Sequence, residues 1–142
     1  MAADTVFAAS GIVGLPPAAS VDDLRRSAAL LVAGAPPVGF ARLEVVDSSA
    51  HLEQLSVHPS AMRQGHGARL VRAAEHWARQ TGFTTMTLIT FRDVPWNAPF
   101  YSALGFAPID ELTPELGRLR EHEKHALGLD ALGARVVMHK HL

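Results

Sequence analysis

The stretch that follows residue 57 constrains the fold more than any other part of the sequence. Val57-His58-Pro59 ends a predicted strand, and Gln64-Gly65-His66-Gly67-Ala68 then opens a long amphipathic helix. The two glycines allow the backbone to turn its N–H groups inward, and the helix N-terminus adds the positive end of its dipole. A strand, a glycine turn and a helix in this order predict a site for a pyrophosphate group, to which Arg63 adds a mobile positive charge.

A dinucleotide-binding fold is the competing interpretation, because it also places glycines before a helix N-terminus. That fold needs a third glycine at the position where this chain has Leu70. It also places its glycines directly after a strand, whereas Pro59 to Gln64 intervene here. The sequence therefore favours a different kind of phosphate site.

The remaining elements are expected in an order typical of a mixed α/β domain with one sheet. The predicted strands are Ala29–Ala33, Val38–Asp47, Ala50–Val57, Thr85–Phe91, Phe106–Leu112 and Arg135–Lys140. The predicted helices are Ser20 to about Ala28, Gly67–Thr81, a short one begun by Asn97, and Pro114 to about Leu127. Since no repeat or linker interrupts this order, residues 1–142 are expected to form one domain.

Composition and charge exclude several classes of protein. With 13 basic and 14 acidic residues the net charge is −1, so no nucleic-acid partner is expected. The absence of cysteine removes disulfides, thiolate zinc sites and a cysteine nucleophile. The stretch from Val6 to Pro17 is predicted to be neither a signal peptide nor a membrane span, and a cytoplasmic location is expected. His122 and His125 lie three apart on a predicted helix, but the charged residues around them favour a solvated face over a metal site.

Three motifs together resemble a known family. They are Leu55-x-Val57-x-Pro59, then Arg63-Gln64-Gly65-His66-Gly67-Ala68, then Pro99-Phe100-Tyr101-x-x-Leu104-Gly105-Phe106. Their order and separation are similar to those of the GNAT superfamily of acyl-CoA-dependent N-acyltransferases. Within that superfamily, the stretch from His51 to His58 is most similar to the arylalkylamine N-acetyltransferases, which carry histidines at the positions of His51 and Glu53.

The resemblance implies a GNAT fold whose central mixed sheet is splayed between Ala50–Val57 and Thr85–Phe91, the fourth and fifth family strands. It implies acetyl-CoA as co-substrate, with pantetheine inserted at the splay and one backbone N–H of this strand holding the thioester oxygen. The implied cofactor-binding residues are Leu55, Ser56, Val57, Arg63, Gln64, Gly65, His66, Gly67, Ala68, Asn97 and Tyr101.

The chain departs from the family pattern at three places. Met62 stands where the family usually has Gln or Arg, so one polar contact is lost or moves to Arg63. Asn97 lies closer to Tyr101 than the family's asparagine does. The first family strand is expected to be missing, which would leave Ala29–Ala33 as a sheet edge. We expect the N-terminal residues or a second subunit, in a homodimer, to cover that edge.

The expected catalytic residues are Tyr101, Glu53 and His51. The resemblance implies that Tyr101 protonates the departing thiolate. A primary alkylamine has a pKa of about 10.4, so some group must take its proton at neutral pH, and either Glu53 or His51 suits that task. Strict alternation places His51, Glu53, Leu55 and Val57 on one strand face, with Leu52, Gln54 and Ser56 on the other.

The expected function is transfer of an acetyl group from acetyl-CoA to a primary amine by direct attack. A small amine is preferred over a protein lysine or N-terminal amine. The alternative is a non-catalytic acyl-CoA-binding module, and a plain structural domain is a more distant one. The helix that begins at Pro114 is expected to shape the acceptor side or a dimer contact.

Overall fold

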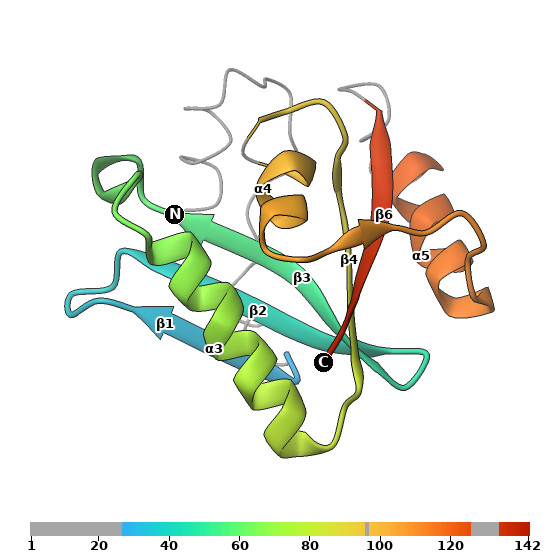
Figure 1. Cartoon of the computed structure of the whole chain (residues 1–142), viewed down its shortest axis with the longest axis horizontal. Coiled ribbons are helices and arrows are strands. Elements are labelled where there is room, and N and C mark those ends of the chain that lie inside the picture. Colours follow the sequence, from blue (N-terminus) through green and yellow to red (C-terminus); the bar gives the residue numbers. More distant parts are fainter. Residues whose placement is uncertain (1–26, 96, 126–133) are drawn as a thin grey trace.

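The computed structural model describes residues 27–95, 97–125 and 134–142, and these form one mixed sheet with helices packed on it (Figure 1). The strands are β1 (Ala29–Ala33), β2 (Gly39–Val46), β3 (Ser49–Val57), β4 (Thr85–Phe91), β5 (Ala107–Pro108) and β6 (Arg135–His141). The helices are η1 (Pro59–Ala61), α3 (His66–Thr81), α4 (Ala98–Ala103) and α5 (Pro114–His125). The mixed α/β class expected from the sequence is confirmed.

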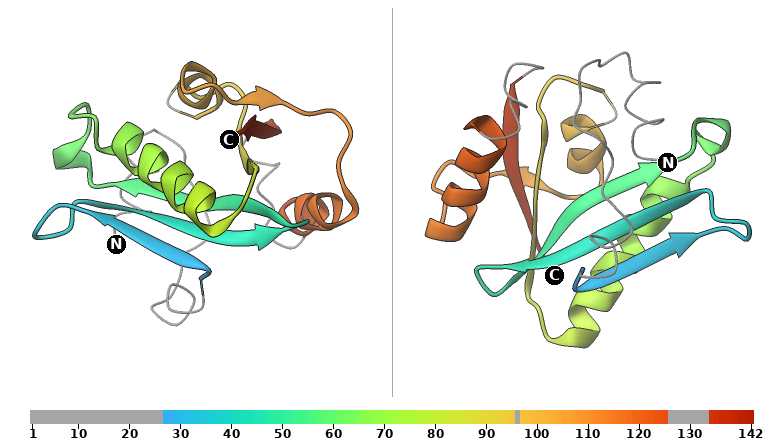
Figure 2. Two further views of the ribbon diagram at one scale, coloured as in Figure 1. Left: turned by 60° about the horizontal axis from the view of Figure 1, so that its bottom comes forward. Right: turned by 180° about the vertical axis from the view of Figure 1, so that it is seen from behind.

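The described strands form a sheet in the order β1-β2-β3-β4-β6-β5. All neighbours run antiparallel except β3 and β4, which are parallel. The connection between these two parallel strands contains α3, and this helix lies across one face of β1, β2 and β3 (Figures 1 and 2). The N-terminus of α3 is therefore brought to the end of β3.

The sheet opens between its two parallel strands. β3 and β4 pair from Ala50 opposite Met86 only as far as Leu52 opposite Leu88. Beyond that point β3 continues beside β2 to Val57, whereas β4, which pairs with β6 along its whole length, continues beside that strand to Phe91. The two strands diverge in Figure 1, and this is the splay that the family resemblance implied.

A β-bulge lies where the two strands part. β2 pairs Arg42 with Gln54 but Leu43 with Leu52, so Glu53 is an extra residue on β3. The extra residue reverses the alternation, and the face assignment expected from the sequence is wrong for half of the strand. Leu52, Leu55 and Val57 belong to the side on which α3 packs. The register places His51, Gln54 and Ser56 on the opposite face, because their β2 partners alternate with the core residues Ala41 and Leu43.

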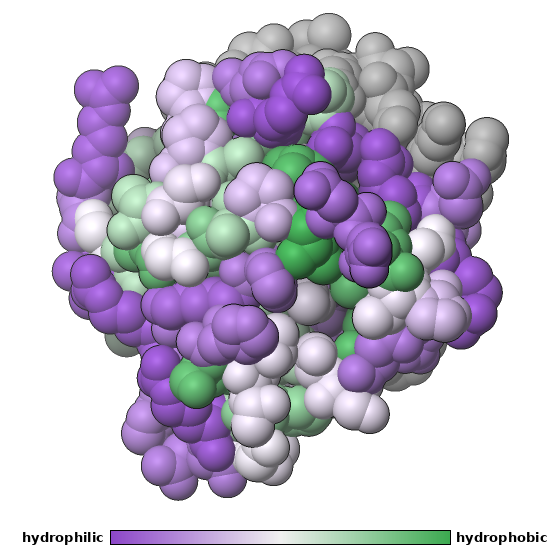
Figure 3. Space-filling view, turned by 45° about the vertical axis from the view of Figure 1, so that its right-hand side comes forward, coloured by the Kyte–Doolittle hydropathy of each residue, from purple (hydrophilic) through white to green (hydrophobic). Residues whose placement is uncertain are grey.

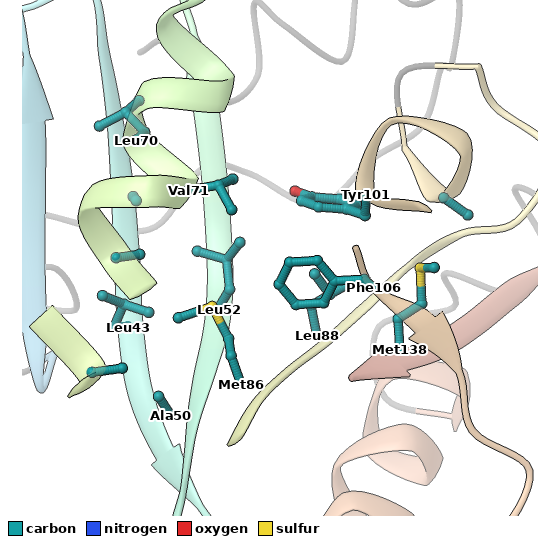
Figure 4. Close-up of a cluster of buried hydrophobic side chains, with 14 residues drawn as sticks. Leu43, Ala50, Leu52, Leu70, Val71, Met86, Leu88, Tyr101, Phe106 and Met138 are labelled. Carbon is teal, nitrogen blue, oxygen red and sulfur yellow. The ribbon is translucent and has the colours of Figure 1, made fainter. Parts of the chain in front are cut away.

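The core lies between α3 and the sheet. The buried stripe of α3 follows the helical period and contacts the inner residues of β2, β3 and β4 (Figure 4), with Leu70, Val71, Ala74 and Ala78 from the helix and Leu43, Leu52, Met86 and Leu88 from the strands. At the start of β2 the packing is tightest. A Cβ on Gly39 would lie 2.7 Å from the carbonyl oxygen of Ser56, so this strand pair approaches closely only because the side chain is absent.

The segment after α4 differs from the prediction. Instead of a strand over Phe106–Leu112, only Ala107 and Pro108 pair with β6. The N–H of Ile109 still donates to the carbonyl oxygen of Val137 at 2.9 Å, but the residues that follow, from Asp110 to Thr113, are exposed and lie outside the strand. The chain instead enters α5, whose N-terminal end docks on the turn between β2 and β3.

Asp47 makes that docking contact. Its carboxylate accepts hydrogen bonds from the hydroxyl of Thr113 and, at 3.1 Å, from the backbone N–H of Leu116. The Asp47 N–H donates to the carboxylate of Glu115. The Thr113 hydrogen bond is the main cause of a lowered Asp47 pKa. Since this turn begins β3, α5 is anchored at the opposite end of β3 from the Val57 end, where the first turn of α3 lies.

The N-terminal expectations concern residues 1–26, which lie outside the described residues. Among the described strands β1 ends the sheet, and Leu30 and Val32 are exposed on it. Within the described ranges no helix is long and apolar enough to cross a membrane. On the side drawn in Figure 3, hydrophilic residues surround smaller hydrophobic areas.

Candidate functional site

A cavity of about 560 Å³ lies where the end of β3, the turn before α3 and the helix α4 come together. Its walls come from three segments that the sequence motifs had singled out. The lining residues are Leu55, Val57, Pro59, Ala61, Met62, Arg63, Gly65, His66, Gly67, Ala68, Asn97, Phe100 and Tyr101. The three motifs therefore meet at one place in the fold.

The turn before α3 is held in a conformation that presents its backbone to the cavity. Gly65 is the N-cap residue of α3, has a φ of 82° and makes no side-chain cap. Arg63 also has a positive φ, of 63°. The first backbone hydrogen bond of the helix runs from the N–H of Arg69 to the carbonyl of Gly65, at 3.0 Å. The preceding N–H groups of the first turn have no partner within the helix, so they are available to an anion in the cavity.

Gly67 lines the cavity at the first turn of α3, and its lack of a side chain leaves space there. A Cβ there would lie 3.4 Å from the Cζ atom of Phe100 across the cavity, which is ordinary contact for a methyl group. A longer side chain on Gly67 would project into the space that the unpaired N–H groups border.

Arg69 stabilises the turn and was missed by the sequence analysis. Its Nη2 donates to the carbonyl oxygen of Gln64 at 3.1 Å and lies 3.0 Å from Nδ1 of His66. The signal available in the sequence was spacing alone, since residues three apart on a helix are neighbours. Arg69 is exposed and does not line the cavity, so its role is to hold the turn rather than to contact a ligand.

Asn97 presents an unsatisfied donor to the cavity. Its side chain is 9% exposed, and its Nδ2 is buried without a hydrogen-bond partner in the described part of the chain. Asn97 is the N-cap residue of α4, where the sequence predicts that a short helix begins, but its side chain makes no capping hydrogen bond. A buried amide nitrogen is costly to leave unpaired, which indicates that a ligand atom accepts its hydrogen bond.

Tyr101 lines the same cavity from α4. Its ring packs edge-on against Phe100 and Phe106, with centroids 5.1 and 5.8 Å away. Figure 4 shows its hydroxyl pointing away from α4 toward α3 and β3. Burial raises the pKa of Tyr101 well above its ordinary value, so the phenol keeps its proton throughout the neutral range.

His51 and Glu53 form a pair at the splay, outside the cavity lining. Nε2 of His51 lies 3.4 Å from Oε2 of Glu53, and Nδ1 of His51 lies 2.8 Å from the hydroxyl oxygen of Thr87 on β4. The side chain of His51 is 2% exposed and that of Glu53 is 28% exposed. The histidine is thus a buried member of the pair, and the carboxylate is its accessible end.

Most of the residues predicted to bind the cofactor line the cavity, and two do not. Ser56 lies on the opposite face of β3, where its hydroxyl is buried without a partner in the described part of the chain. Gln64 is exposed on the turn and does not line the cavity. Met62, noted as a departure from the family pattern, does line it. Trp96, for which the sequence leaves lining of the acceptor pocket and packing in a turn equally open, lies outside the described residues. The described residues contain no group of three or more side chains suited to a metal.

Comparisons with known proteins agree with this arrangement. Residues 16–106 match the acetyltransferase (GNAT) family. Over 98 residues the chain is 38% identical to aminoglycoside N(6')-acetyltransferase type 1 of Klebsiella aerogenes, covering 61% of this chain and 64% of that protein. The chain therefore spans less than two thirds of the length of this curated relative.

Two solved structures share the fold over nearly the whole chain. N-acetylglutamate synthase from Neisseria gonorrhoeae, complexed with coenzyme A and N-acetyl-glutamate, has a TM-score of 0.71 at 18% identity, covering 99% of this chain and 32% of that one. Rv2747 from Mycobacterium tuberculosis, in complex with CoA, has a TM-score of 0.70 at 19% identity, covering 99% of this chain and 95% of that one. At such low identity these likenesses concern the fold alone.

Proposed function

The chain belongs to the acetyltransferase (GNAT) family, and from this premise we propose that it transfers the acetyl group of acetyl-CoA to a primary amine. The observation that carries the proposal is the cavity beside the splay, bordered by the first turn of α3, whose N–H groups have no partner within the helix. Acetyl-CoA supplies an acyl group already activated as a thioester. The chain's own residues bind this co-substrate, orient it and move the protons.

The lining of the cavity fits the chemistry of coenzyme A. The N–H groups of His66, Gly67 and Ala68, with Arg63 nearby, suit a pyrophosphate. The free edge of β3 at Leu55 and Val57 suits the amide groups of pantetheine, since no β4 residue pairs with β3 beyond Leu52. Asn97 supports the same assignment, because it lines the cavity and its buried Nδ2 is a donor without a partner in the described part of the chain.

Tyr101 is the proposed proton donor for the departing thiolate. Its raised pKa keeps the hydroxyl protonated, and its position in the wall of the cavity supports this role. The chain contains no cysteine, so no thiol is present to carry the acyl group, and direct attack by the amine is the simpler route.

Glu53 and His51 together are the proposed proton acceptor. They lie at the splay, where β3 and β4 separate and the sheet is open from one face to the other. The acceptor amine then approaches from the face opposite α3, while coenzyme A lies on the α3 side. Roughly 0.1% of an alkylamine is neutral at physiological pH, about 7.4, so removing its proton is worth about 4 kcal/mol to the reaction.

The proposed acceptor is a small primary amine. The curated relative is named for acetylation of an aminoglycoside, which is an amine-bearing sugar. The residues around His51 and Glu53 resemble arylalkylamine acetyltransferases, which also act on small primary amines. A protein lysine or N-terminal amine presents the same chemistry and is the second candidate.

An amine panel with thiol detection tests the proposal. Aminoglycosides, arylalkylamines, polyamines and lysine-containing peptides are each incubated with acetyl-CoA, and the free thiol of coenzyme A is followed. Amine-dependent thiol release is expected with a small amine. Tight binding of coenzyme A without release for any amine would instead favour the non-catalytic acyl-CoA-binding module.

A further inference from the structure

The buried hydroxyl group of Thr87, on β4, contacts His51, one of the two residues of the proposed proton acceptor. Thr87 lies directly opposite His51 in the parallel register of β3 and β4, and its side chain is almost fully buried. Its Oγ1 lies 2.8 Å from Nδ1 of His51, whose other ring nitrogen faces Glu53. The three side chains form a line from the buried interior of the sheet to the accessible carboxylate.

The hydrogen-bonding capacities of these groups decide how the imidazole is protonated. An ionised carboxylate only accepts, so Nε2 of a neutral His51 carries its hydrogen toward Glu53. Nδ1 then has a lone pair and must accept, and a threonine hydroxyl can donate to it. The reverse tautomer would turn a lone pair of Nε2 toward the negative charge of Glu53.

We propose that Thr87 is a positioning residue: its hydroxyl fixes His51 in the Nε2–H tautomer, and His51 in turn holds the Glu53 carboxylate at the splay. The inference rests on the proposed function, because it assigns Glu53 the proton of the incoming amine and His51 the task of orienting it. The burial of the histidine and the exposure of the carboxylate support this division. Without the hydroxyl, Nδ1 of His51 would be left buried without a donor in the described part of the chain.

The location of Glu53 on β3 explains why its carboxylate needs to be held by a neighbouring side chain. Glu53 is the extra residue of the bulge, so on β3 it lacks the ladder partner that would fix its side chain. His51 and Thr87 lie one residue before the last pair of the parallel ladder, where the backbone is still held. The titratable groups nearest in register are Glu44, opposite His51 on β2, and His139, opposite Thr87 on β6.

Three variants of the full chain test the inference. Thr87→Val removes the hydroxyl and keeps the shape of the side chain, whereas Thr87→Ser keeps the hydroxyl. Thr85→Val is the matched control, because Thr85 lies on the same face of β4, two residues earlier and away from the splay. Each variant is assayed for kcat and for KM with acetyl-CoA and the best amine. Imidazole ¹⁵N NMR reports the tautomer, with the His51 signals among the eight histidines assigned by their loss in His51→Gln.

The expected result is a fall in kcat on the order of 10- to 100-fold in Thr87→Val, with an unchanged KM for acetyl-CoA, recovery in Thr87→Ser and no effect of Thr85→Val. The wild-type spectrum should show Nε2–H, and Thr87→Val should show a mixture of tautomers. An Nδ1–H tautomer in the wild type, or a Thr87→Val variant with unaltered spectrum and kcat, would overturn the inference. A wild-type protein that acetylates no amine would instead overturn the proposed function, and the spectra would still decide how His51 is held.

Discussion

The ammonium of Lys140 lies 2.7 Å from the carboxylate of Glu75, and this ion pair joins the last strand to the buried face of α3. Lys140 also donates a hydrogen bond, 2.8 Å long, to the carbonyl oxygen of Leu104, which ends α4. A single ammonium therefore connects β6, α3 and the helix that carries Tyr101. The relation matters for function because α3 and α4 form facing walls of the cavity.

Removal of this cation should destabilise the protein. In Lys140→Met the carboxylate of Glu75 stays buried, and among the described residues it retains the ion pair with Arg79, whose Nη2 lies 3.6 Å away. We expect the free energy of unfolding, measured in urea, to fall by about 3 kcal/mol. The double variant Glu75→Met/Lys140→Met removes both charges and should recover most of that loss. Equal free energies of unfolding for Lys140→Met and the wild type would show that the ion pair does not stabilise the fold.

Binding of coenzyme A should depend on the absence of a side chain at Gly67. Gly67→Glu places a negative charge where the pyrophosphate is proposed to lie, and calorimetry should detect no binding. Gly67→Ala is the matched control, because its methyl group would meet the ring of Phe100 at ordinary contact distances, 3.4 Å from Cζ and 3.9 Å from Cε1. The alanine variant should bind nearly as well as the wild type. Unchanged affinity in the glutamate variant would place the pyrophosphate elsewhere.

Loss of the Tyr101 hydroxyl should reduce turnover without loosening the fold. Tyr101→Phe keeps the ring contacts with Phe100 and Phe106 and removes only the proton donor. General acid catalysis contributes roughly 10²–10⁴-fold, and kcat should fall within that range while the affinity for coenzyme A is preserved. If the phenylalanine variant turns over like the wild type, another group protonates the thiolate.

Ionisation of the Tyr101 hydroxyl should make the stability of the protein depend on pH in the alkaline range, which can be measured without a substrate. Tyr101 is the only tyrosine, and burial raises its folded-state pKa above the ordinary value of 10.0. Its contribution to stability is therefore complete below pH 10 and is lost as the pH rises from there toward the folded-state pKa. The absorbance of tyrosinate should appear only together with alkaline unfolding. Ionisation near pH 10 in the folded protein would mean that the ring is solvated.

Protonation of Asp47 at acidic pH should release the N-terminal end of α5 from the turn between β2 and β3. Its folded-state pKa is lowered, so the contact is fully present above the unfolded value of 3.8 and is lost as the pH falls through the folded value. Asp47→Ala should have the same effect at neutral pH. Hydrogen exchange at the Leu116 amide, which donates to this carboxylate, is the measurement. Protection of that amide in the alanine variant would contradict the prediction.

Much of the fold could be predicted from the sequence because the patterns are local. Gly65 and Gly67 before an amphipathic stretch predict the turn and α3 together, and Thr85–Phe91 was predicted with its observed bounds. The bulge at Glu53 could not be predicted, since it arises from the pairing of β3 with β2 rather than from the sequence of β3 itself. The short length of β5 could not be predicted either, since the apolar residues from Phe106 to Ile109 favour a strand and its extent depends on the pairing with β6.

The site shows the same division. The cavity lining follows from motif residues whose separation in the sequence is typical of one family, and the structure brings them together. Thr87 could not be found in this way, because its contact with His51 depends on which residues of two parallel strands lie opposite each other. Arg69 and Lys140 could not be found for a different reason, because each donates to a backbone carbonyl group and no sequence pattern identifies such an acceptor.

The most direct test of acetyl transfer is a mass-spectrometric assay of the purified chain with acetyl-CoA and a panel of primary amines. Both products, the acetylated amine and free coenzyme A, are counted in the same reaction. The account predicts that they form in equal amounts and with the primary amine as the modified group. It also predicts that Glu53→Gln slows both equally. Binding of coenzyme A without any acetylated amine, or product formation at the same rate in Glu53→Gln and Tyr101→Phe as in the wild type, would contradict it.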